Sequence, residues 1–360
     1  MTAAGPVTPA RASAAMEGRV LAGAALVSLV TPRRLEEVLA RWPEPVSALR
    51  SLGEDTPPGL ARTLAGRDTR VLLASDPGFP IPEDLPRRPP LLLVEGERDS
   101  VFEAPRVAIV GTRAATPHGL ADARHLGAFL AGASITVVSG MAIGVDAEAH
   151  LGALSVAEAG GGGPAGPVGV LATGLDVVYP RRHRSLFDRV RQAGVLVSEC
   201  PFGTLPEPGR FPVRNRIIAA LADVVVVVEA TLKGGSRITA ERALDYGRPV
   251  FAIPGSRRNP AAAGCNALLA DGAQPLLDPS DIILALGMTP GARRGWAAPG
   301  PKRSLTSSAT GVHRALGGEP AHPDELSART GLPPDQVAVA IEELVDAGRV
   351  ERSRGFVWPI

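Results

Sequence analysis

The middle of the chain, from Arg106 to about Leu286, alternates short β-rich runs with amphipathic helical segments. This alternation is typical of a doubly wound sheet, in which helices connect parallel strands and cover both faces. The Val224–Val228 run is uninterrupted valine, as expected of a central strand that is buried on both sides. Strands are predicted at Val107–Val110, Thr136–Ser139, Val168–Ala172, Val195–Ser198, Val224–Val228 and Val250–Ile253. The predicted fold class is α/β, with a mostly parallel sheet.

The segment before this sheet reads as a small helical domain at residues 17–70, of the SAM or helix-hairpin-helix kind. Prolines at Thr31-Pro32, Trp42-Pro43 and Thr56-Pro57-Pro58 end one helix or start the next. Residues 1–16 are rich in Ala, Pro and Thr and are predicted to be a disordered tail, because they can bury little apolar surface. The sheet domain is placed at residues 71–288, with an extended lead-in at 71–105.

The end of the chain is predicted to be a linker followed by a winged-helix domain. Residues 289–312 are rich in Pro, Gly, Ser and Arg and form the linker, and residues 313–360 form the domain. Its helices are expected at Asp324–Thr330 and Asp335–Ala347, with a wing at Arg349–Trp358. The second helix contains acidic residues and no Lys or Arg, so phosphate repulsion opposes its entry into a DNA groove. We therefore interpret it as a protein-contact or regulatory module.

Charge places any polyanion site in a local cluster rather than over the whole molecule. The 360 residues contain 38 Lys+Arg and 37 Asp+Glu, a net charge of +1. The segment from Arg181 to Arg216, however, contains eight arginines and only three acidic residues. The two cysteines, Cys200 and Cys265, are too few for a disulfide framework and lack zinc-site spacing, which favours a cytoplasmic location. The apolar stretch from Val20 to Val30 is short of the about 20 residues that a membrane span needs, so no membrane contact is expected.

Small and polar residues follow several of the predicted strands, where an open α/β sheet binds its ligands. Exposed amides and helix N-termini at such loops favour an anion. The loop Gly111–Thr116 lacks the G-x-G-x-x-G fingerprint and no Walker A lysine is present, so neither a dinucleotide nor an NTP is expected, and no cofactor is predicted. Arginine binds phosphate and stacks on bases, and Phe202 and Phe211 are candidate stacking platforms. A single-stranded nucleic acid is the expected ligand.

The motifs themselves resemble one family in order and spacing, the DNA processing protein A family, also called DprA or Smf. The resemblance covers most of residues 106–286. It rests on Arg106–Arg113, Ser139–His150, Gly174–Pro180, Phe211–Ile218, Gly234–Thr239 and Gly247–Gly255. Two positions depart from the family pattern: Thr112 replaces the commoner serine, and Arg181 stands where relatives often have lysine.

The resemblance implies an extended Rossmann-like fold and sequence-independent binding of single-stranded DNA in a basic pocket. It also implies a homodimer that protects strands in natural transformation and recombination and loads the RecA recombinase, without being an enzyme. The residues expected to contact DNA are Gly111, Thr112, Arg113, Ser139, Gly140, Arg181, Phe211, Arg214, Asn215, Arg216, Lys233, Gly234 and Ser236.

Two rival functions remain at this point. The segment from Lys233 to Glu241 superficially resembles the phosphate loop of lysine-decarboxylase-like nucleoside phosphate phosphoribohydrolases, but that loop needs glycine where this chain has Arg237 and Ile238. Release of ribose 5-phosphate from a nucleoside monophosphate would support this rival. The other is an interaction scaffold based on the winged helix, which predicts that deletion of residues 313–360 abolishes function.

Overall fold

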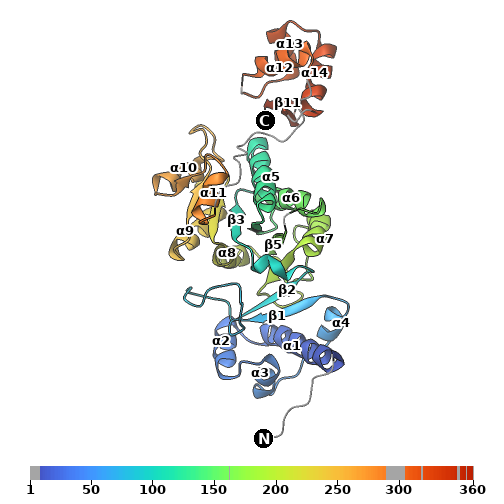
Figure 1. Ribbon diagram of the computed structural model, residues 1–360, viewed down its shortest axis with the longest axis vertical. Coiled ribbons are helices and arrows are strands. Elements are labelled where there is room, and N and C mark those ends of the chain that lie inside the picture. The colour runs from blue at the N-terminus through green and yellow to red at the C-terminus, as the bar shows by residue number, and fades with distance from the viewer. Residues whose placement is uncertain are drawn as a thin grey trace.

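A large, mostly parallel sheet forms the centre of the protein, with a helical module at one end and a winged helix at the other (Figure 1). The computed structural model describes residues 9–161, 163–288, 305–317, 319–346, 349–353 and 355–359. The strand order is β1-β2-β6-β5-β4-β3-β7-β8-β9. The strands are β1 Thr69–Leu73, β2 Leu91–Glu95, β3 Arg106–Val110, β4 Thr136–Ser139, β5 Pro167–Val170, β6 Val195–Ser198, β7 Val224–Val227, β8 Val250–Ala252 and β9 Gln274–Pro275.

In this order, the seven strands β6-β5-β4-β3-β7-β8-β9 pair in parallel. Strand β2 pairs antiparallel with β6, and β1 pairs antiparallel with β2, so these two strands extend the sheet beyond β6. The six strands expected from the valine-rich runs are all present, each within two residues of its expected ends. Strands β1, β2 and β9 were not predicted. Strand β2 lies in the expected extended lead-in, β1 begins two residues before it at the end of the expected helical domain, and β9 is two exposed residues with no apolar pattern. The α/β, mostly parallel prediction is confirmed.

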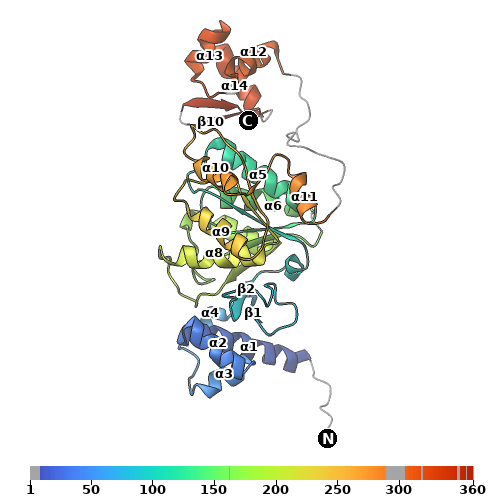
Figure 2. The same ribbon diagram turned by 90° about the vertical axis from the view of Figure 1, so that its left-hand side faces the viewer.

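Helices cover both faces of the sheet (Figure 2). Helices α8, α9 and α10 pack on one face, through Ile217, Ala240 and Leu268, while α5, α6 and α11 pack on the other, through Leu126, Ala149 and Ile282. The elements of this domain are η1 Asp99–Phe102, α5 Pro117–Gly132, α6 Val145–Glu158, η2 Arg181–His183, α7 Arg184–Ala193, α8 Arg210–Leu221, α9 Gly235–Asp245, α10 Ala263–Ala270 and α11 Ser280–Ala285. This two-sided cover leaves the strand ends to receive a ligand.

The N-terminal module contains α1 Pro9–Leu29, α2 Pro32–Arg41, α3 Pro45–Ser51 and α4 Leu60–Leu64. Helix α1 begins at Pro9, so the expected disordered tail 1–16 is helical from residue 9 onward, consistent with the high helix propensity of its alanines. Residues 1–8 lie outside the described residues. Leu26 and Leu49 share a core with Leu73 and Leu93 of β1 and β2, so this module packs directly on the sheet. Among the helices described, none combines the length and apolar character that crossing a bilayer requires.

The winged helix has a hydrophobic core of its own, built from Val312, Leu326, Ile341 and Val357. Its elements are α12 Ser307–Leu316, α13 Pro323–Thr330, α14 Pro334–Asp346, β10 Val350–Ser353 and β11 Phe356–Pro359. Helix α12 was not predicted and overlaps the expected linker 289–312, whose residues 289–304 lie outside the described ones. Its N-cap is Thr306, whose hydroxyl accepts a hydrogen bond from the Ala309 amide.

Candidate functional site

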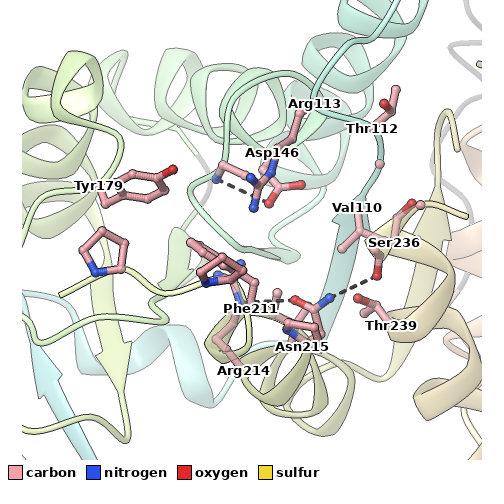
Figure 3. A pocket seen from close by; sticks show the side chains of 18 residues that line it. Val110, Thr112, Arg113, Asp146, Tyr179, Phe211, Arg214, Asn215, Ser236 and Thr239 are labelled. Atoms are coloured by element: carbon pink, nitrogen blue, oxygen red, sulfur yellow. Dashed lines mark hydrogen bonds between the residues drawn. The ribbon is translucent and has the colours of Figure 1, made fainter. Parts of the chain in front are cut away.

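A cavity of about 520 Å³ opens at the carboxyl ends of the parallel strands, which we call the carboxyl-end edge. The loop that follows β3, the first half of α8 and the start of α9 form its walls, and Tyr179 joins them from the loop after β5. Figure 3 shows Tyr179 on one side of this hollow and Thr112 and Ser236 on the other. Parallel strands end at the same edge of a sheet, so segments distant in sequence meet here.

Glu229, two residues after the end of β7, fixes the loop that carries Arg113. Its carboxylate accepts hydrogen bonds from the Thr116 amide at 2.8 Å and the Thr116 hydroxyl at 2.7 Å. Its backbone carbonyl accepts from the Thr112 amide at 2.7 Å. Gly119 has no room for a side chain, because a Cβ there would lie 2.5 Å from the Glu229 carboxyl group. Burial, with the nearby charge of Glu229, raises the pKa of Asp122 to about 6.

Arg113 is exposed and has no carboxylate within ion-pair distance among the described residues. Its guanidinium lies over the Phe211 ring, 4.8 Å from the ring centroid. The Tyr179 ring is 5.7 Å from that of Phe211, centroid to centroid. The site therefore combines a free cation with two neighbouring aromatic rings, an arrangement suited to phosphates and unstacked bases.

Arg214 lines the same cavity but has a different environment. It is buried, and its guanidinium donates hydrogen bonds to the carbonyls of Gly140, at 2.7 Å, and of Val170. A Cβ at Gly140 would lie 2.7 Å from the Arg214 Cζ, so only glycine fits at that position. Burial lowers the pKa of Arg214 to about 10, which still leaves it charged at neutral pH. Arg214 thus holds together the ends of β4 and β5.

Asp146, at the start of α6, is the buried carboxylate of this site. It accepts hydrogen bonds from the amides of Gly140 and Ala142, at 3.2 and 3.4 Å. Burial raises the pKa of Asp146, and the positive charge of Arg214 acts in the opposite direction. Asp146 and Glu229 thus both accept hydrogen bonds from backbone amides at this edge.

The structure brings most of the predicted DNA-contact residues into the cavity wall and leaves some outside it. Asn215 joins α8 to α9 through a hydrogen bond from its side-chain amide to the Gly235 carbonyl, at 3.1 Å. Those lining the cavity are Gly111, Thr112, Arg113, Phe211, Arg214, Asn215, Gly234 and Ser236, and those outside its wall are Ser139, Gly140, Arg181, Arg216 and Lys233.

The expectation that Arg216 lines the same pocket is wrong. Two residues further along α8 than Arg214, it faces another direction, where its guanidinium pairs with Glu199 and donates to the Arg87 carbonyl at 2.8 Å. Ser139 is also turned away, because its buried hydroxyl donates to the Ile109 carbonyl at 2.6 Å. Arg181 and Lys233 are exposed beside the cavity, each next to a lining segment.

The arginine-rich stretch between Arg181 and Arg216 is also less basic than its sequence indicates. Arg189 pairs with Glu158, and Arg191 with Glu95 and Asp188. Arg210 pairs with Glu207 in the same way. With Arg216 also paired and Arg214 buried, the exposed unpaired arginines of this stretch lie at its start.

The sequence motifs did not predict that a proline-rich segment forms one side of the cavity. Pro206, Pro208 and Pro212 line it, in and after a loop with little regular structure. Proline-rich loops are usually read as connectors, and their position over a site depends on the tertiary fold. Tyr179 did carry a signal, since it belongs to one of the motifs that the family shares.

A Rossmann-like domain with a charged and aromatic pocket at its carboxyl-end edge, joined to a winged helix, defines a class of nucleic-acid-handling protein. Residues 70–287 match the DNA recombination-mediator protein A family, and residues 297–355 match the DprA winged helix domain. The chain belongs to the DNA recombination-mediator protein A family. This confirms the resemblance found in the motifs.

Relatives and solved structures agree with this assignment. Protein Smf of Synechocystis sp. is 32% identical over 324 residues, covering 81% of this chain and 80% of that protein. The putative DNA processing protein DprA of Mycobacterium tuberculosis is 41% identical over 251 residues, covering 69% of this chain and 63% of that protein, slightly less than two thirds of its length.

The structure of DprA from Streptococcus pneumoniae superposes with a TM-score of 0.58 at 28% identity, covering 77% of this chain and 98% of that one. DNA processing protein A from Helicobacter pylori superposes with a TM-score of 0.52 at 31% identity, covering 61% of this chain and 95% of that one. The latter structure is described in terms of its single-stranded DNA binding mode.

Proposed function

We propose that this protein binds single-stranded DNA without sequence preference at the carboxyl-end edge and passes the strand to a recombinase. The observation that carries the proposal is the exposed Arg113, which lines the cavity, lies over Phe211 and has no ion pair among the described residues. An arginine fork binds phosphate through two hydrogen bonds, and the ring beneath it holds the fork in place. The loop that presents Arg113 is fixed by Glu229, so little ordering remains to be done on binding.

A single strand suits this site better than a duplex. Tyr179 and Phe211 can stack only on bases that are not already paired and stacked in a double helix. Gly234 and Ser236, at the start of α9, add backbone amides and the positive end of a helix dipole to the anion site. Contacts to backbone phosphates carry no base information, which accounts for binding without sequence preference.

Three further parts of the proposal rest on the family rather than on a contact in this chain. They are the loading of RecA onto the bound strand, the homodimer, and the role in natural transformation and recombination. A protein that hands DNA to a recombinase works in the cytoplasm, which is the location we propose. No catalytic residue is assigned.

Fluorescence anisotropy of a labelled oligonucleotide, single-stranded or duplex, tests the DNA-binding proposal. Wild type is expected to bind the single strand more tightly than the duplex. Loss of one charge-assisted phosphate contact removes about 1.5–3 kcal/mol, so Arg113→Ala is expected to weaken single-strand binding about 10- to 100-fold. The slope of log affinity against log salt concentration should fall by about 0.7.

Arg189→Ala is the matched control, since it removes an arginine that is already paired with Glu158 on the outside of α7. It is expected to bind like wild type. The titrations are made at two salt concentrations. If Arg113→Ala and wild type bind the single strand with equal affinity at both of them, Arg113 does not belong to the site. If wild type binds neither strand, the proposed function is wrong, and release of ribose 5-phosphate from nucleoside monophosphates becomes the next assay.

A further inference from the structure

Three exposed arginines next to the cavity have no ion-pair partner in the part of the chain that the structure describes. Arg181 and Arg182 lie on η2 and Arg184 is the first residue of α7. All three are exposed, and no carboxylate of the described residues lies within ion-pair distance of them. We call these three residues the η2 arginines. The later arginines of the same helix, Arg189 and Arg191, are both ion-paired.

The fold itself gains nothing from charges placed in this way. A helix N-terminus carries a partial positive charge, so cations there are unfavourable by a few tenths of a kcal/mol or more. The η2 arginines also repel one another, because they lie within four consecutive residues of the chain. An anion bound at this place would relieve both effects, which points to a ligand rather than to stability.

The backbone that carries the η2 arginines is anchored beside the cavity by its neighbours. The ring of His183, between Arg182 and Arg184, donates a hydrogen bond to the Met141 carbonyl at 3.2 Å, just after β4. Strand β4 lies beside β3, which carries the Arg113 loop. Tyr179, two residues before Arg181, lines the cavity and packs against Phe211. A polymer that leaves the cavity past Tyr179 therefore reaches the η2 arginines next.

We propose that Arg182 and Arg184, together with Arg181, bind the backbone phosphates of single-stranded DNA where the strand leaves the cavity past Tyr179. This inference rests on the proposed function, because it extends the same site. The cavity then holds a short stretch of the strand, and the η2 arginines hold the adjoining phosphates. Each guanidinium can grip one phosphate with two hydrogen bonds.

The test compares two lengths of oligothymidylate on the full-length protein, one of about six nucleotides that reaches little beyond the cavity and one of about twenty. The variant is Arg182→Ala/Arg184→Ala. The control is Arg33→Ala/Arg34→Ala, which removes the same charge from exposed arginines of α2 that pair with Glu37. Helix α2 lies in the N-terminal module, at the far end of the molecule from the winged helix (Figure 1).

The η2 variant is expected to bind the short oligonucleotide like wild type and the long one at least tenfold more weakly. Loss of two phosphate contacts should lower its salt slope for the long oligonucleotide by about 1.4. Its melting temperature should equal or exceed that of wild type, since the removed charges are unfavourable in the free protein. The control variant should match wild type with both oligonucleotides.

If the η2 variant binds the long oligonucleotide with the affinity and the salt slope of wild type, the proposal is overturned. An acidic protein partner is then the remaining candidate ligand of this patch. An equal loss in the charge-matched control would also overturn it, by showing a general effect of net charge. In both cases, binding of the short oligonucleotide by wild type still supports the proposed function. If wild type binds neither oligonucleotide, the proposed function itself falls.

Discussion

The carboxyl-end edge of the sheet and the winged helix differ in the pairing of several of their charged side chains. In the winged helix, Arg352 pairs with Glu342, Arg329 pairs with Glu325, and Glu343 accepts two hydrogen bonds from Thr306. At the carboxyl-end edge, Arg113 and the η2 arginines have no carboxylate within ion-pair distance among the described residues. A charged side chain that is already paired within the fold binds an external ligand less strongly, because binding must first break the existing pair. A cluster of unpaired exposed cations beside an aromatic pocket therefore marks the proposed DNA site better than a count of arginines.

A second difference lies between two arginines of the cavity itself. Arg214 donates hydrogen bonds to the carbonyls of Gly140 and Val170, whereas the Arg113 side chain is exposed to solvent. The buried arginine holds the strand ends, and the exposed one is free for the ligand. The carboxyl-end edge therefore uses one arginine for its structure and leaves the other exposed, whereas the winged helix forms ion pairs at its surface.

The largest effect is expected from Arg214→Ala. Removing one member of a buried charged network leaves Asp146 and two carbonyls without compensation, so the free energy of unfolding should fall by about 3–5 kcal/mol. Denaturant unfolding measures this. The counterpart in the winged helix, Arg329→Ala, breaks an exposed pair and should change stability by less than about 1 kcal/mol. Similar losses in both variants would contradict the distinction between buried and surface pairing.

The next effect depends on pH and concerns Asp122, beside Glu229. Because the folded-state pKa of Asp122 is raised from 3.8 to about 6, its ionisation weakens the fold as pH rises through 6. Asp122→Asn removes that effect, so at pH 7 the variant should be more stable than wild type by about 3 kcal/mol. The difference should vanish below about pH 4, where both side chains are neutral. A difference that does not change with pH would show that Asp122 is not strained by its charge.

A smaller effect is expected when Arg113 is replaced by lysine. The charge stays, but the planar fork and its stacking over Phe211 are lost, so affinity for single-stranded DNA should fall about three- to tenfold. The salt slope should stay close to that of wild type, because the number of neutralised phosphates is unchanged. Anisotropy titrations at several salt concentrations separate these two quantities. Full retention of affinity would show that charge alone accounts for the contact.

The smallest effect is expected from removing the winged helix at residues 305–360. Its core is separate from those of the sheet domain, and its described contact with that domain includes the edge-on packing of Trp358 against His118. Affinity for single-stranded DNA should therefore change by no more than about twofold, as for independent sites. Thermal unfolding checks that the remaining domains stay folded. Loss of binding in a folded truncation would favour the winged helix as the interface.

Much of the fold could be predicted because it depends on local pattern. The runs of β-branched residues placed β4 and β6 at their observed bounds, and Thr31-Pro32 marked the start of α2. Hydrophobic period and capping act over a few residues, so the sequence carries them directly. The motifs placed Gly111, Arg113 and Phe211 at one cavity for a related reason, since parallel strands end at one edge.

The tertiary structure alone decided which arginines are free. Arg189 and Arg191 find acidic partners 31 and 96 residues away, at Glu158 and Glu95, and Arg216 turns to Glu199. The η2 arginines, in the same stretch of sequence, find none among the described residues. Ion pairing depends on distances set by packing between remote segments, and composition does not encode those distances. The sequence therefore determined where the proposed site lies, and the fold determined which of its charges remain available to a ligand.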